Sequence, residues 1–348
     1  MVATVISYHD YRCTLTHDTI LFMKSSQITF INQPKLSLHE VDVKSNERRI
    51  GLIPHVEVFL NQHPLFKEKN VQATFPSVGS ASFTCILEVE GIKRVLKIPL
   101  SSQSFYESEG AFLNAWEKVG VKVPHVIEEG KIDGSYYLLM EFIDAKTLPE
   151  EYKKGTLIRQ EIFVKMGSTL RMMHTAKSEG FGVVKDGKGV DSRFNEWLDY
   201  QIKHKASYAS DERFLDDNKH GNFSLAILKM NEYVGESTES SYCHNDFAYQ
   251  NIFATEPLTV FDPIPIFGHP YMDLARAIVT ALGRGIDEEA IEQLIRGYTG
   301  NDLVLNRSVL QAAIILQSYL KFGYWSKTGK EQGIKDVQMY QEKTKEYL

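Results

Sequence analysis

The most informative part of this 348-residue sequence is the octapeptide HNDFAYQN at positions 244–251, which is followed, after the apolar run LTVF, by Asp262. Asp246 can accept a proton from a hydroxyl group, while Asn251 and Asp262 can offer the oxygen ligands that Mg²⁺ prefers. Two short β-like runs surround this polar segment, and most of the sequence around it has the pattern of helices. We therefore expect the chemistry of the protein to lie here.

A second pair of charged residues lies upstream, in sequence that predicts β-structure. The β-rich runs 71–78, 82–90 and 93–100 are separated by short turns and predict an antiparallel meander. Lys97 lies near the end of the third run, and Glu109 follows twelve positions later in a predicted helix. A lysine on the third strand paired with a helix glutamate is how kinases hold the phosphates of ATP. Together with the polar segment, this pair supplies the charge, the metal ligands and the base that phosphoryl transfer needs.

The chain divides into three parts by pattern. Residues 1–70 hold two short β-like runs and a short helix interrupted by Pro54, and we interpret them as an N-terminal extension of unknown role. Residues 71–145 predict a small β-rich lobe with one helix, closed by a β run at 135–143. Residues 146–348 carry apolar residues at steps of three or four and predict a larger, mainly helical lobe. Its later helices are expected at 271–283, 287–298, 308–325 and 331–347.

Charge and composition narrow the possible partners and compartments. The formal net charge is −6, which argues against nucleic acid as a partner because nucleic acid needs a basic face. No apolar run approaches the roughly 18 residues of a membrane helix, and the first residues lack the pattern of a signal peptide. The three cysteines include no CxxC pair, so zinc and disulfide scaffolds are poor interpretations. We expect a cytoplasmic protein with reduced thiols and no membrane span.

Three motifs resemble a known superfamily. The octapeptide has the H-x-D-x-x-x-x-N form of the protein-kinase-like fold, and residues 262–275 read D-P-x-P-x-x-G-x-P-x-x-D-L-A. Leu170 to His174, followed by Gly-Phe-Gly at 180–182, is similar to a helix that ends in His before a tight turn. Together these motifs resemble the aminoglycoside phosphotransferase and choline kinase superfamily, over residues 71 to 345. The resemblance implies an α+β fold of two lobes, one with a small antiparallel sheet and one helix, the other mainly helical.

The resemblance also implies roles for the residues of the polar segment. Asp246 matches the catalytic base, and Asn251 and Asp262 match the metal ligands. His244 and Asp273 match structural positions that brace the catalytic loop. A bracing role suits His244 because no second His or Cys stands at a metal-ligand spacing from it.

Nucleotide-binding positions follow from the same resemblance. Lys97 matches the phosphate-binding lysine and Glu109 its ion-pair partner. The phosphate loop, PSVGSASF, keeps only Gly79 of the fullest pattern, so Ser80 and backbone N–H groups would cover the phosphates. The expected cofactors are therefore ATP and Mg²⁺, with GTP as the alternative nucleotide. The backbone of two further residues falls where the hinge would bind adenine, namely Glu141 and Ile143.

Three functions fit these observations. The leading interpretation is a kinase that phosphorylates a hydroxyl group of a small molecule. A protein Ser/Thr kinase is the alternative, but only ten residues separate Asp262 from Asp273 and no Ala-Pro-Glu follows, which leaves little room for an activation loop. The third is a pseudokinase that serves as a binding scaffold, against which the intact Lys97, Asp246 and Asn251 argue.

The acceptor is expected to be a cationic, hydroxylated small molecule, such as an aminoglycoside or choline. Residues 191–242 contain ten acidic and six basic residues, and carboxylates that line a cleft attract cations. Trp197 and Tyr200 in the same segment can add cation–π contacts to an ammonium group. The competing interpretation is an ordinary acidic helix face in contact with solvent.

Overall fold

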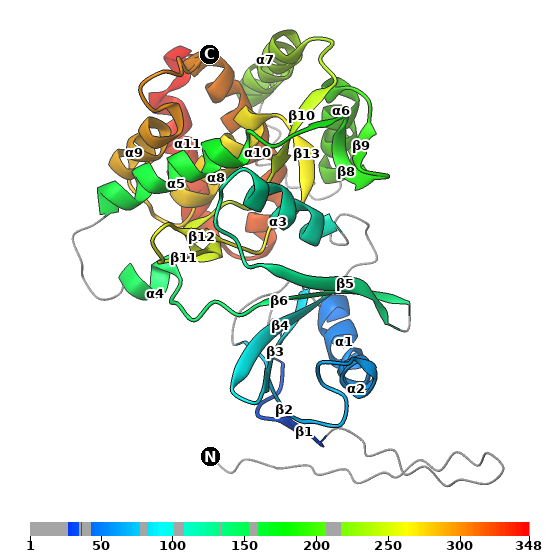
Figure 1. Cartoon of the computed structure of the whole chain (residues 1–348). Coiled ribbons are helices and arrows are strands. Elements are labelled where there is room, and N and C mark those ends of the chain that lie inside the picture. The colour runs from blue at the N-terminus through cyan, green and yellow to red at the C-terminus, as the bar shows by residue number, and fades with distance from the viewer. Residues whose placement is uncertain are drawn as a thin grey trace, which may run out of the picture. The chain divides into compact units, whose positions relative to one another are not determined.

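The computed structural model describes residues 27–34, 36, 43–76, 82–100, 108–132, 134–152, 159–206 and 217–347. The contacts of the chain divide it into two compact units, which are described separately here (Figure 1). Unit 1 comprises Met1–Gln103 and Pro124–Ile143, and unit 2 comprises Ser104–Val123 and Asp144–Leu348.

Unit 1 is built on a six-stranded sheet with the order β1-β2-β3-β4-β6-β5. Its strands are β1 (Gln27–Phe30), β2 (Asn70–Thr74), β3 (Ser82–Val89), β4 (Ile92–Pro99), β5 (Val126–Ile132) and β6 (Ser135–Glu141). The predicted meander forms β2, β3 and β4, which pair antiparallel, whereas β1 joins β2 in parallel. In β3 the alternate residues Phe83, Cys85 and Leu87 are buried, as the two-residue period of a strand requires.

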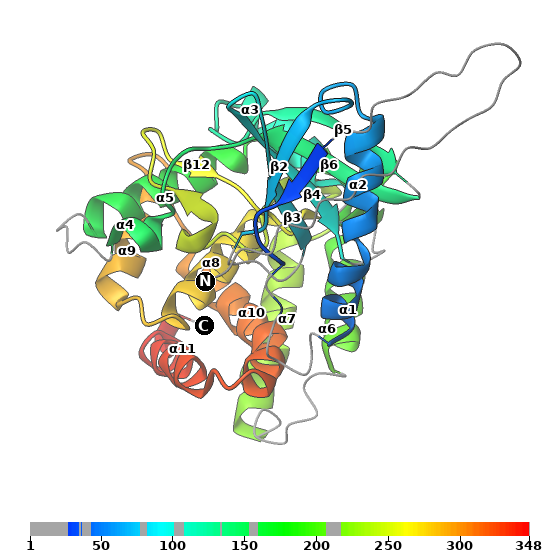
Figure 2. The same cartoon turned by 90° about the horizontal axis from the view of Figure 1, so that it is seen from below.

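Two helices from the first 70 residues belong to unit 1, and the second of them contributes to its core. These are α1 (Val43–Gly51) and α2 (Ile53–Gln62), which lie on one face of the sheet (Figures 1 and 2). Pro54 stands in the first turn of α2, where a proline is tolerated, so it marks the start of a second helix. The apolar side chains of α2 are buried in one cluster with the sheet residues, among them Val56, Phe59 and Leu60.

A small polar network ties α2 to the far edge of this sheet. The ring nitrogen Nε2 of His63, just after α2, lies 3.1 Å from Oε2 of Glu128 on β5. The hydroxyl of Tyr137 on β6 donates to the other carboxylate oxygen at 2.5 Å. The side chain of Glu128 is 46% exposed, so this network reaches the surface. The strand β5 itself was not predicted, because it is an edge strand with acidic, exposed residues at positions where β-prone residues are usual.

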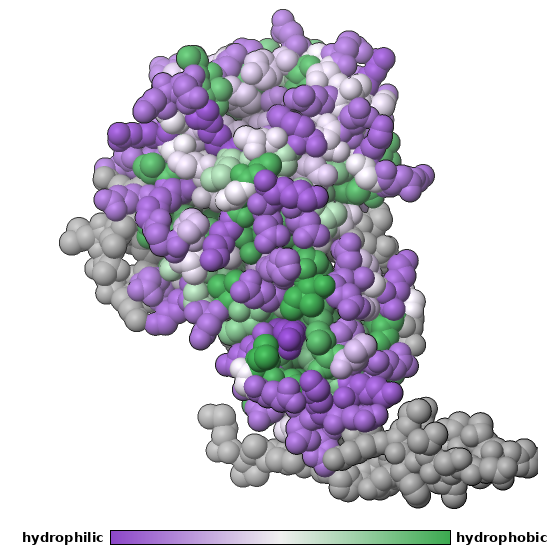
Figure 3. Space-filling view, in the orientation of Figure 1, coloured by the Kyte–Doolittle hydropathy of each residue, from purple (hydrophilic) through white to green (hydrophobic). Residues whose placement is uncertain are grey.

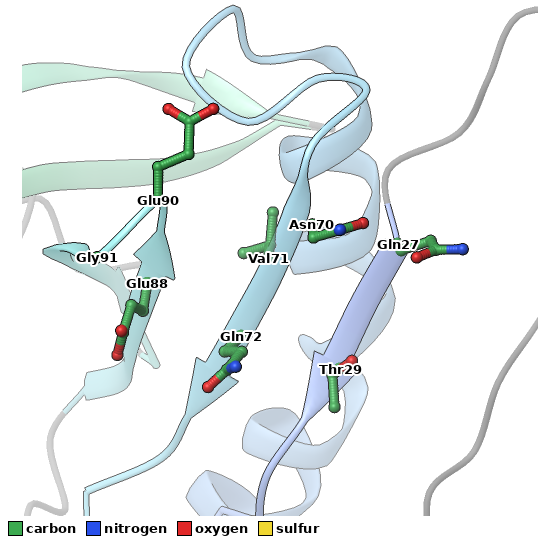
Figure 4. A pocket seen from close by; sticks show the side chains of 8 residues that line it. All are labelled: Gln27, Thr29, Asn70, Val71, Gln72, Glu88, Glu90 and Gly91. Atoms are coloured by element: carbon green, nitrogen blue, oxygen red, sulfur yellow. The ribbon is translucent and has the colours of Figure 1, made fainter.

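A hollow of about 390 Å³ lies on the strands at the other end of this sheet (Figure 4). Its lining comes from β1, β2, β3 and the turn after β3: Gln27, Thr29, Asn70, Val71, Gln72, Glu88, Glu90 and Gly91. None of the predicted site residues is among them. The helix that follows β4, α3 (Glu109–Lys118), groups with unit 2.

Unit 2 is mainly helical and also contains a five-stranded sheet with the order β7-β10-β13-β8-β9. Its other helices are α4 (Leu148–Tyr152), α5 (Arg159–Met173), α6 (Phe194–Ala206), α7 (Asp217–Val234), α8 (Pro270–Leu282), α9 (Glu288–Thr299), α10 (Arg307–Lys327) and α11 (Glu331–Lys343). The sheet strands are β7 (Lys177–Glu179), β8 (Phe181–Lys185), β9 (Lys188–Asp191), β10 (Glu239–Cys243) and β13 (Ile266–Gly268). The four predicted late helices are present as α8 to α11.

The helices α5 and α9 approach closely because each has a glycine at the crossing. A Cβ atom on Gly167 would lie 2.0 Å from the Leu294 carbonyl oxygen, and one on Gly297 would lie 2.0 Å from that of Val164. Real Cβ atoms do not come so near to backbone atoms. The two glycines therefore set how closely α5 and α9 pack, and α5 leads into His174 while α9 carries Tyr298.

Hydrophilic side chains cover most of the face seen in Figure 3. Among the described residues, no helix combines the length and the apolar character that crossing a membrane requires.

Candidate active site

The polar segment of the sequence lies between β10 and β13 of unit 2. After β10, residues 244–248 form a loop, Tyr249–Asn251 form a 3₁₀ turn, and β11 (Ile252–Phe253) pairs antiparallel with β12 (Thr259–Val260). The N–H of Phe261 donates to the carbonyl of Asn251 at 3.0 Å, so this hairpin brings Asn251 next to Asp262 although eleven positions separate them. The two residues predicted as metal ligands therefore stand at the same end of one hairpin.

Asp273, in the first turn of α8, fixes the start of the loop. Its Oδ2 accepts from the N–H of His244 and its Oδ1 from the N–H of Asn245, both at 2.7 Å. The His174 ring adds a third contact, Nε2 to Oδ2 at 3.1 Å, and its Nδ1 lies 2.8 Å from the Tyr298 hydroxyl. Burial alone would raise the pKa of Asp273, but the hydrogen bonds and charge of His174 hold it below its usual value. A buried carboxylate with these partners stays ionised and fixes the loop by its backbone.

His244 holds the loop to the segment that carries Asp262. Its Nδ1 accepts from the N–H of Asp246 at 3.3 Å, and its Nε2 lies 3.0 Å from the carbonyl oxygen of Phe261. Those partners fit a neutral ring with the proton on Nε2, because a carbonyl only accepts. Burial lowers the pKa of His244, although the nearby carboxylates act in the opposite direction. The indole of Trp116 stacks on this ring at 5.8 Å, which leaves the imidazole as a fixed brace.

The carboxylate of Asp246 has different neighbours at its two oxygens. Oδ2 accepts from Nδ2 of Asn251 at 3.1 Å, and the same amide group donates to the Asp246 carbonyl at 2.9 Å. Oδ1 lies 3.9 Å from Nζ of Lys321, which comes from α10. Because the Nδ2 of Asn251 donates both of these hydrogen bonds, the Oδ1 of its side chain is the atom that could bind a cation. The carboxylate thus has a side toward Asn251 and a side toward Lys321.

Two residues of this site have a left-handed backbone. The φ angle is 55° at Asn245 and 57° at Asp262. Residues with a side chain adopt this region rarely, and Asn and Asp do so more readily than most. At Asn245 the conformation is held by the hydrogen bond to Asp273. Local strain of this kind often occurs where a chain must present particular groups.

The predicted nucleotide residues belong mostly to unit 1. Lys97 on β4 is buried, and so is Glu109 at the start of α3 in unit 2; their ion pair stays a prediction. Glu141 ends β6, and its N–H donates to the His125 carbonyl at 2.9 Å, so its carbonyl is the group that adenine could use. Ile143 follows, half-buried, after the end of β6. The remaining two predicted residues, Gly79 and Ser80, lie outside the described residues.

The donor set of the site suits a hard cation. Asn251 and Asp262 offer an amide oxygen and a carboxylate, the ligand types that Mg²⁺ prefers. Among the described residues a second cluster has ligand-like spacing, formed by His174, Cys243 and Asp273. In this cluster both oxygens of Asp273 already accept from N–H groups, and burial raises the pKa of the Cys243 thiol. This second cluster is therefore a hydrogen-bonded brace and not a metal site.

Two basic residues of the site were not predicted from the sequence. Lys321 is buried, with 8% of its surface exposed, and donates to the Thr280 hydroxyl. Arg276 lies one turn after Asp273 on α8, and its Nε is buried with no hydrogen-bond partner among the described residues. The sequence did contain a signal for Lys321. This lysine lies four positions after Gln317 and four before Trp325, so it falls on the buried face of an apolar helix. Charged residues on such a face are unusual unless they have a partner or a function.

The model of the phosphotransferase enzyme family matches residues 74–307. The chain belongs to this family. The matched segment of this phosphotransferase includes β3, Lys97, the loop of residues 244–248, the β11–β12 hairpin and the whole of α8. It ends before most of α10, and therefore before Lys321.

Individual relatives agree with that assignment. The probable ketoamine kinase of Staphylococcus aureus is 24% identical over 195 residues, which are 52% of this chain and 63% of that relative, so less than two thirds of the relative's length is spanned. A structure of aminoglycoside phosphotransferase APH(4)-Ia with AMP-PNP and hygromycin B aligns with a TM-score of 0.59 at 16% identity, covering 84% of this chain and 98% of that chain. A protein of Thermobifida fusca YX-ER1, provisionally a fructosamine-3-kinase, gives a TM-score of 0.53 at 16% identity over 78% of this chain and 95% of that chain. These likenesses confirm the expected α+β kinase-like fold.

Proposed function

We propose that this phosphotransferase is an ATP- and Mg²⁺-dependent kinase that phosphorylates a hydroxyl group of a small molecule. The observation that carries this proposal is the placement of Asp246, whose carboxylate stands on a loop fixed at both ends by His244 and Asp273. Asn251 orients one of its oxygens, which leaves the other for a hydroxyl proton. A base held in this way fits a reaction that depends on positioning more than on covalent chemistry.

In this proposal the acceptor hydroxyl binds at Oδ1 of Asp246, which takes its proton as the terminal phosphoryl group of ATP is transferred. Asn251 and Asp262 would hold Mg²⁺ by their oxygen atoms, and the ion would supply charge that neutralises the phosphates. Lys97 would hold the phosphates with Glu109 as its partner. Gly79 and Ser80 would cover them, and the backbone of Glu141 and Ile143 would bind the base of ATP, with GTP as the alternative.

The other two functions find less support. The ten residues between Asp262 and Asp273 are taken up mainly by β13 and the start of α8, which leaves no length for the activation loop of a protein kinase. A scaffold without activity would not need an oriented Asp246 beside Asn251. A cytoplasmic location stays a prediction; within the described part of the chain, Cys85 and Cys243 are free and buried.

The cationic acceptor stays a prediction from the acidity of residues 191–242. Several of these carboxylates have surface partners: Glu236 pairs with Arg193 at 2.9 Å and Glu239 with Lys177 at 3.4 Å. Exposed pairs of this kind suit an ordinary solvated surface.

The decisive experiment compares two carboxylate variants with a matched control. Asp246→Asn should lower phosphoryl transfer by about 10²–10⁴ while leaving the affinity for Mg-ATP nearly unchanged, because the base acts on the acceptor. Asp262→Asn should weaken Mg-ATP binding more, since an amide lacks the charge that a hard dication favours. Asp186→Asn, at an exposed position in the turn between β8 and β9, should change neither quantity.

Transfer is measured with labelled ATP against ketoamines, aminoglycosides, choline and hydroxy acids, and binding by calorimetry. Wild-type turnover in Asp246→Asn would remove the base from its role. Equal Mg-ATP affinities in the two variants would remove Asp262 from the metal site. Absence of transfer to every acceptor class, together with no binding of Mg-ATP, would contradict the proposed function as a whole.

A further inference from the structure

Basic side chains gather around the Oδ1 side of Asp246. Lys321 stands 3.9 Å from this oxygen and lies 5.4 Å over the ring of Trp325. Arg276, on α8, interacts with the charges of both Asp246 and Lys321. Arg284, just after α8, lies 6.0 Å over the ring of Tyr249, beside Asn251 in the catalytic turn. Lys321 and Arg276 thus come from two different helices, and the charge of Asp246 acts on both.

The cluster is completed by Lys330, which precedes α11 and interacts with the charges of Arg284 and Asp246. We name Arg276, Arg284, Lys321 and Lys330 the basic cluster. The charges of Asp246 and Asp273 act on members of this cluster. Asp273 is already occupied by His174 and two backbone N–H groups. Of these two carboxylates, Asp246 is therefore the one whose Oδ1 stands open to Lys321.

The burial of two members of the cluster, Lys321 and Arg276, has a physical cost in the protein alone. Burial, and then the charge of Arg276, hold the pKa of Lys321 well below its usual value. Burial also lowers the pKa of Arg276, whose buried Nε has no partner in the described part of the chain. A buried donor without an acceptor is destabilising. An anion beside Arg276 and Lys321 would give the Arg276 Nε an acceptor and the buried Lys321 a counter-charge, while Arg284 and Lys330 are exposed and could reach the same anion.

The position of the cluster suggests which anion it receives. Asn251 lies at Oδ2 of Asp246, on the side where metal and nucleotide phosphates are proposed, whereas Lys321 lies at Oδ1. Under the proposed function, on which this step rests, the acceptor hydroxyl meets Oδ1. We propose that the acceptor carries an anionic group, a carboxylate or phosphate, next to its reacting hydroxyl, and that the basic cluster binds this group. Ketoamines formed from amino acids are one class of molecule that has both groups.

The test uses pairs of acceptors that differ only in the anion. Fructosyl-glycine is compared with 1-deoxy-1-methylamino-fructose, and glycerate with glycerol, by kcat/KM with Mg-ATP. The wild-type protein should prefer the carboxylate member of a pair at least about tenfold, the effect of one charge-assisted hydrogen bond. Lys321→Met keeps the length of the side chain and should reduce this preference to nearly one, chiefly through a higher KM for the carboxylate member.

Exposed positions give a matched pair of variants that should not disturb folding. Lys330→Met should lower the preference severalfold, whereas Lys335→Met, at an exposed position within α11, should leave it unchanged. A loss of kcat that is equal for both members in Lys321→Met would assign this lysine to the transferred phosphoryl group and overturn the inference. A better neutral or cationic acceptor would overturn it as well.

A second measurement separates this inference from the proposed function. Without ATP, fructosyl-glycine should raise the melting temperature of the wild-type protein more than its carboxylate-free partner, and Lys321→Met should abolish the difference. This shift without any phosphoryl transfer would support the anion site and contradict the kinase function. Transfer to both members of each pair without the shift or the preference would support the kinase function and overturn the anion site.

Discussion

Two networks in this molecule combine a histidine, a carboxylate and a tyrosine, and they differ in burial. In unit 1, Glu128 joins His63 to Tyr137 and keeps 46% of its side chain exposed. In unit 2, Asp273 joins His174 to the loop, Tyr298 is bonded to the same histidine, and the Asp273 side chain is 1% exposed.

The difference lies in what each carboxylate holds. Glu128 accepts from two side chains and ties one helix to a sheet edge. Asp273 accepts from two backbone N–H groups and so fixes the conformation of the chain two residues before Asp246. Water can replace lost partners at Glu128 but not at Asp273, because a buried group must find its hydrogen bonds within the protein. The same three residue types therefore make a replaceable surface contact at Glu128, whereas at the buried Asp273 they fix the position of the backbone.

The largest effect that tests this contrast is expected for Asp273→Asn. The substitution turns an amide N–H₂ toward a backbone N–H and removes the charge that faces His174, so the free energy of unfolding of unit 2 should fall by about 3–5 kcal/mol. All three tryptophans, Trp116, Trp197 and Trp325, belong to unit 2. Urea unfolding followed by tryptophan fluorescence therefore reports this unit. A loss below about 1 kcal/mol would show that burial gives Asp273 no special role.

An intermediate effect on the stability of unit 2 is expected from a change of pH. It acts through His269, the residue that caps the start of α8, the helix that carries Asp273. The His269 side chain accepts from the N–H of Tyr271 at 3.2 Å at the start of α8, and burial lowers its pKa to about 4. In the unfolded chain a histidine has a pKa near 6.5, so as the pH falls the unfolded state takes up a proton at His269 before the folded state does. Stability is thus complete above about pH 6.5 and is lost as the pH falls toward 4, by up to about 3 kcal/mol.

The measurement is urea unfolding of unit 2 at several pH values between 7.5 and 4. His269→Asn retains a capping side chain without a titrating ring, so the decline across this range should become shallower. An identical pH profile in the variant and the wild-type protein would exclude His269 as the source.

The smallest effect is expected for Glu128→Gln. The hydrogen bond from Tyr137, opposed in part by burial, lowers the pKa of Glu128, but solvent screens this half-exposed carboxylate. The amide retains an acceptor for Tyr137, so unit 1 should lose less than about 1 kcal/mol. Hydrogen exchange of α2 and β5 measures the change locally. A loss as large as that of Asp273→Asn would remove the distinction between the two networks.

The sequence predicts the parts of this fold that have strong periodicity or a dense motif. The strands β2 to β4 and the helices α8 to α11 show regular apolar spacing, and the spacing of Asp246, Asn251 and Asp262 indicated a common site. The strand β5 was missed because Glu128 and Glu129 hide its period. Lys321 was missed because its partner Asp246 is 75 positions away in the sequence, and only the folding of α10 against α8 and α7 brings the two together.

The burial of α2 has a consequence for where this protein can be shortened. The segment shared with the family begins at residue 74, which is the last residue of β2. Phe59, Leu60 and Phe66 precede this segment in the sequence, yet they are buried against the sheet. A chain cut at the family boundary would present a bare apolar sheet face and an unpaired strand edge to solvent, both of which promote aggregation. The helix α2, which precedes the shared segment, is thus a structural part of the sheet's core, and a chain trimmed to the shared segment should be insoluble.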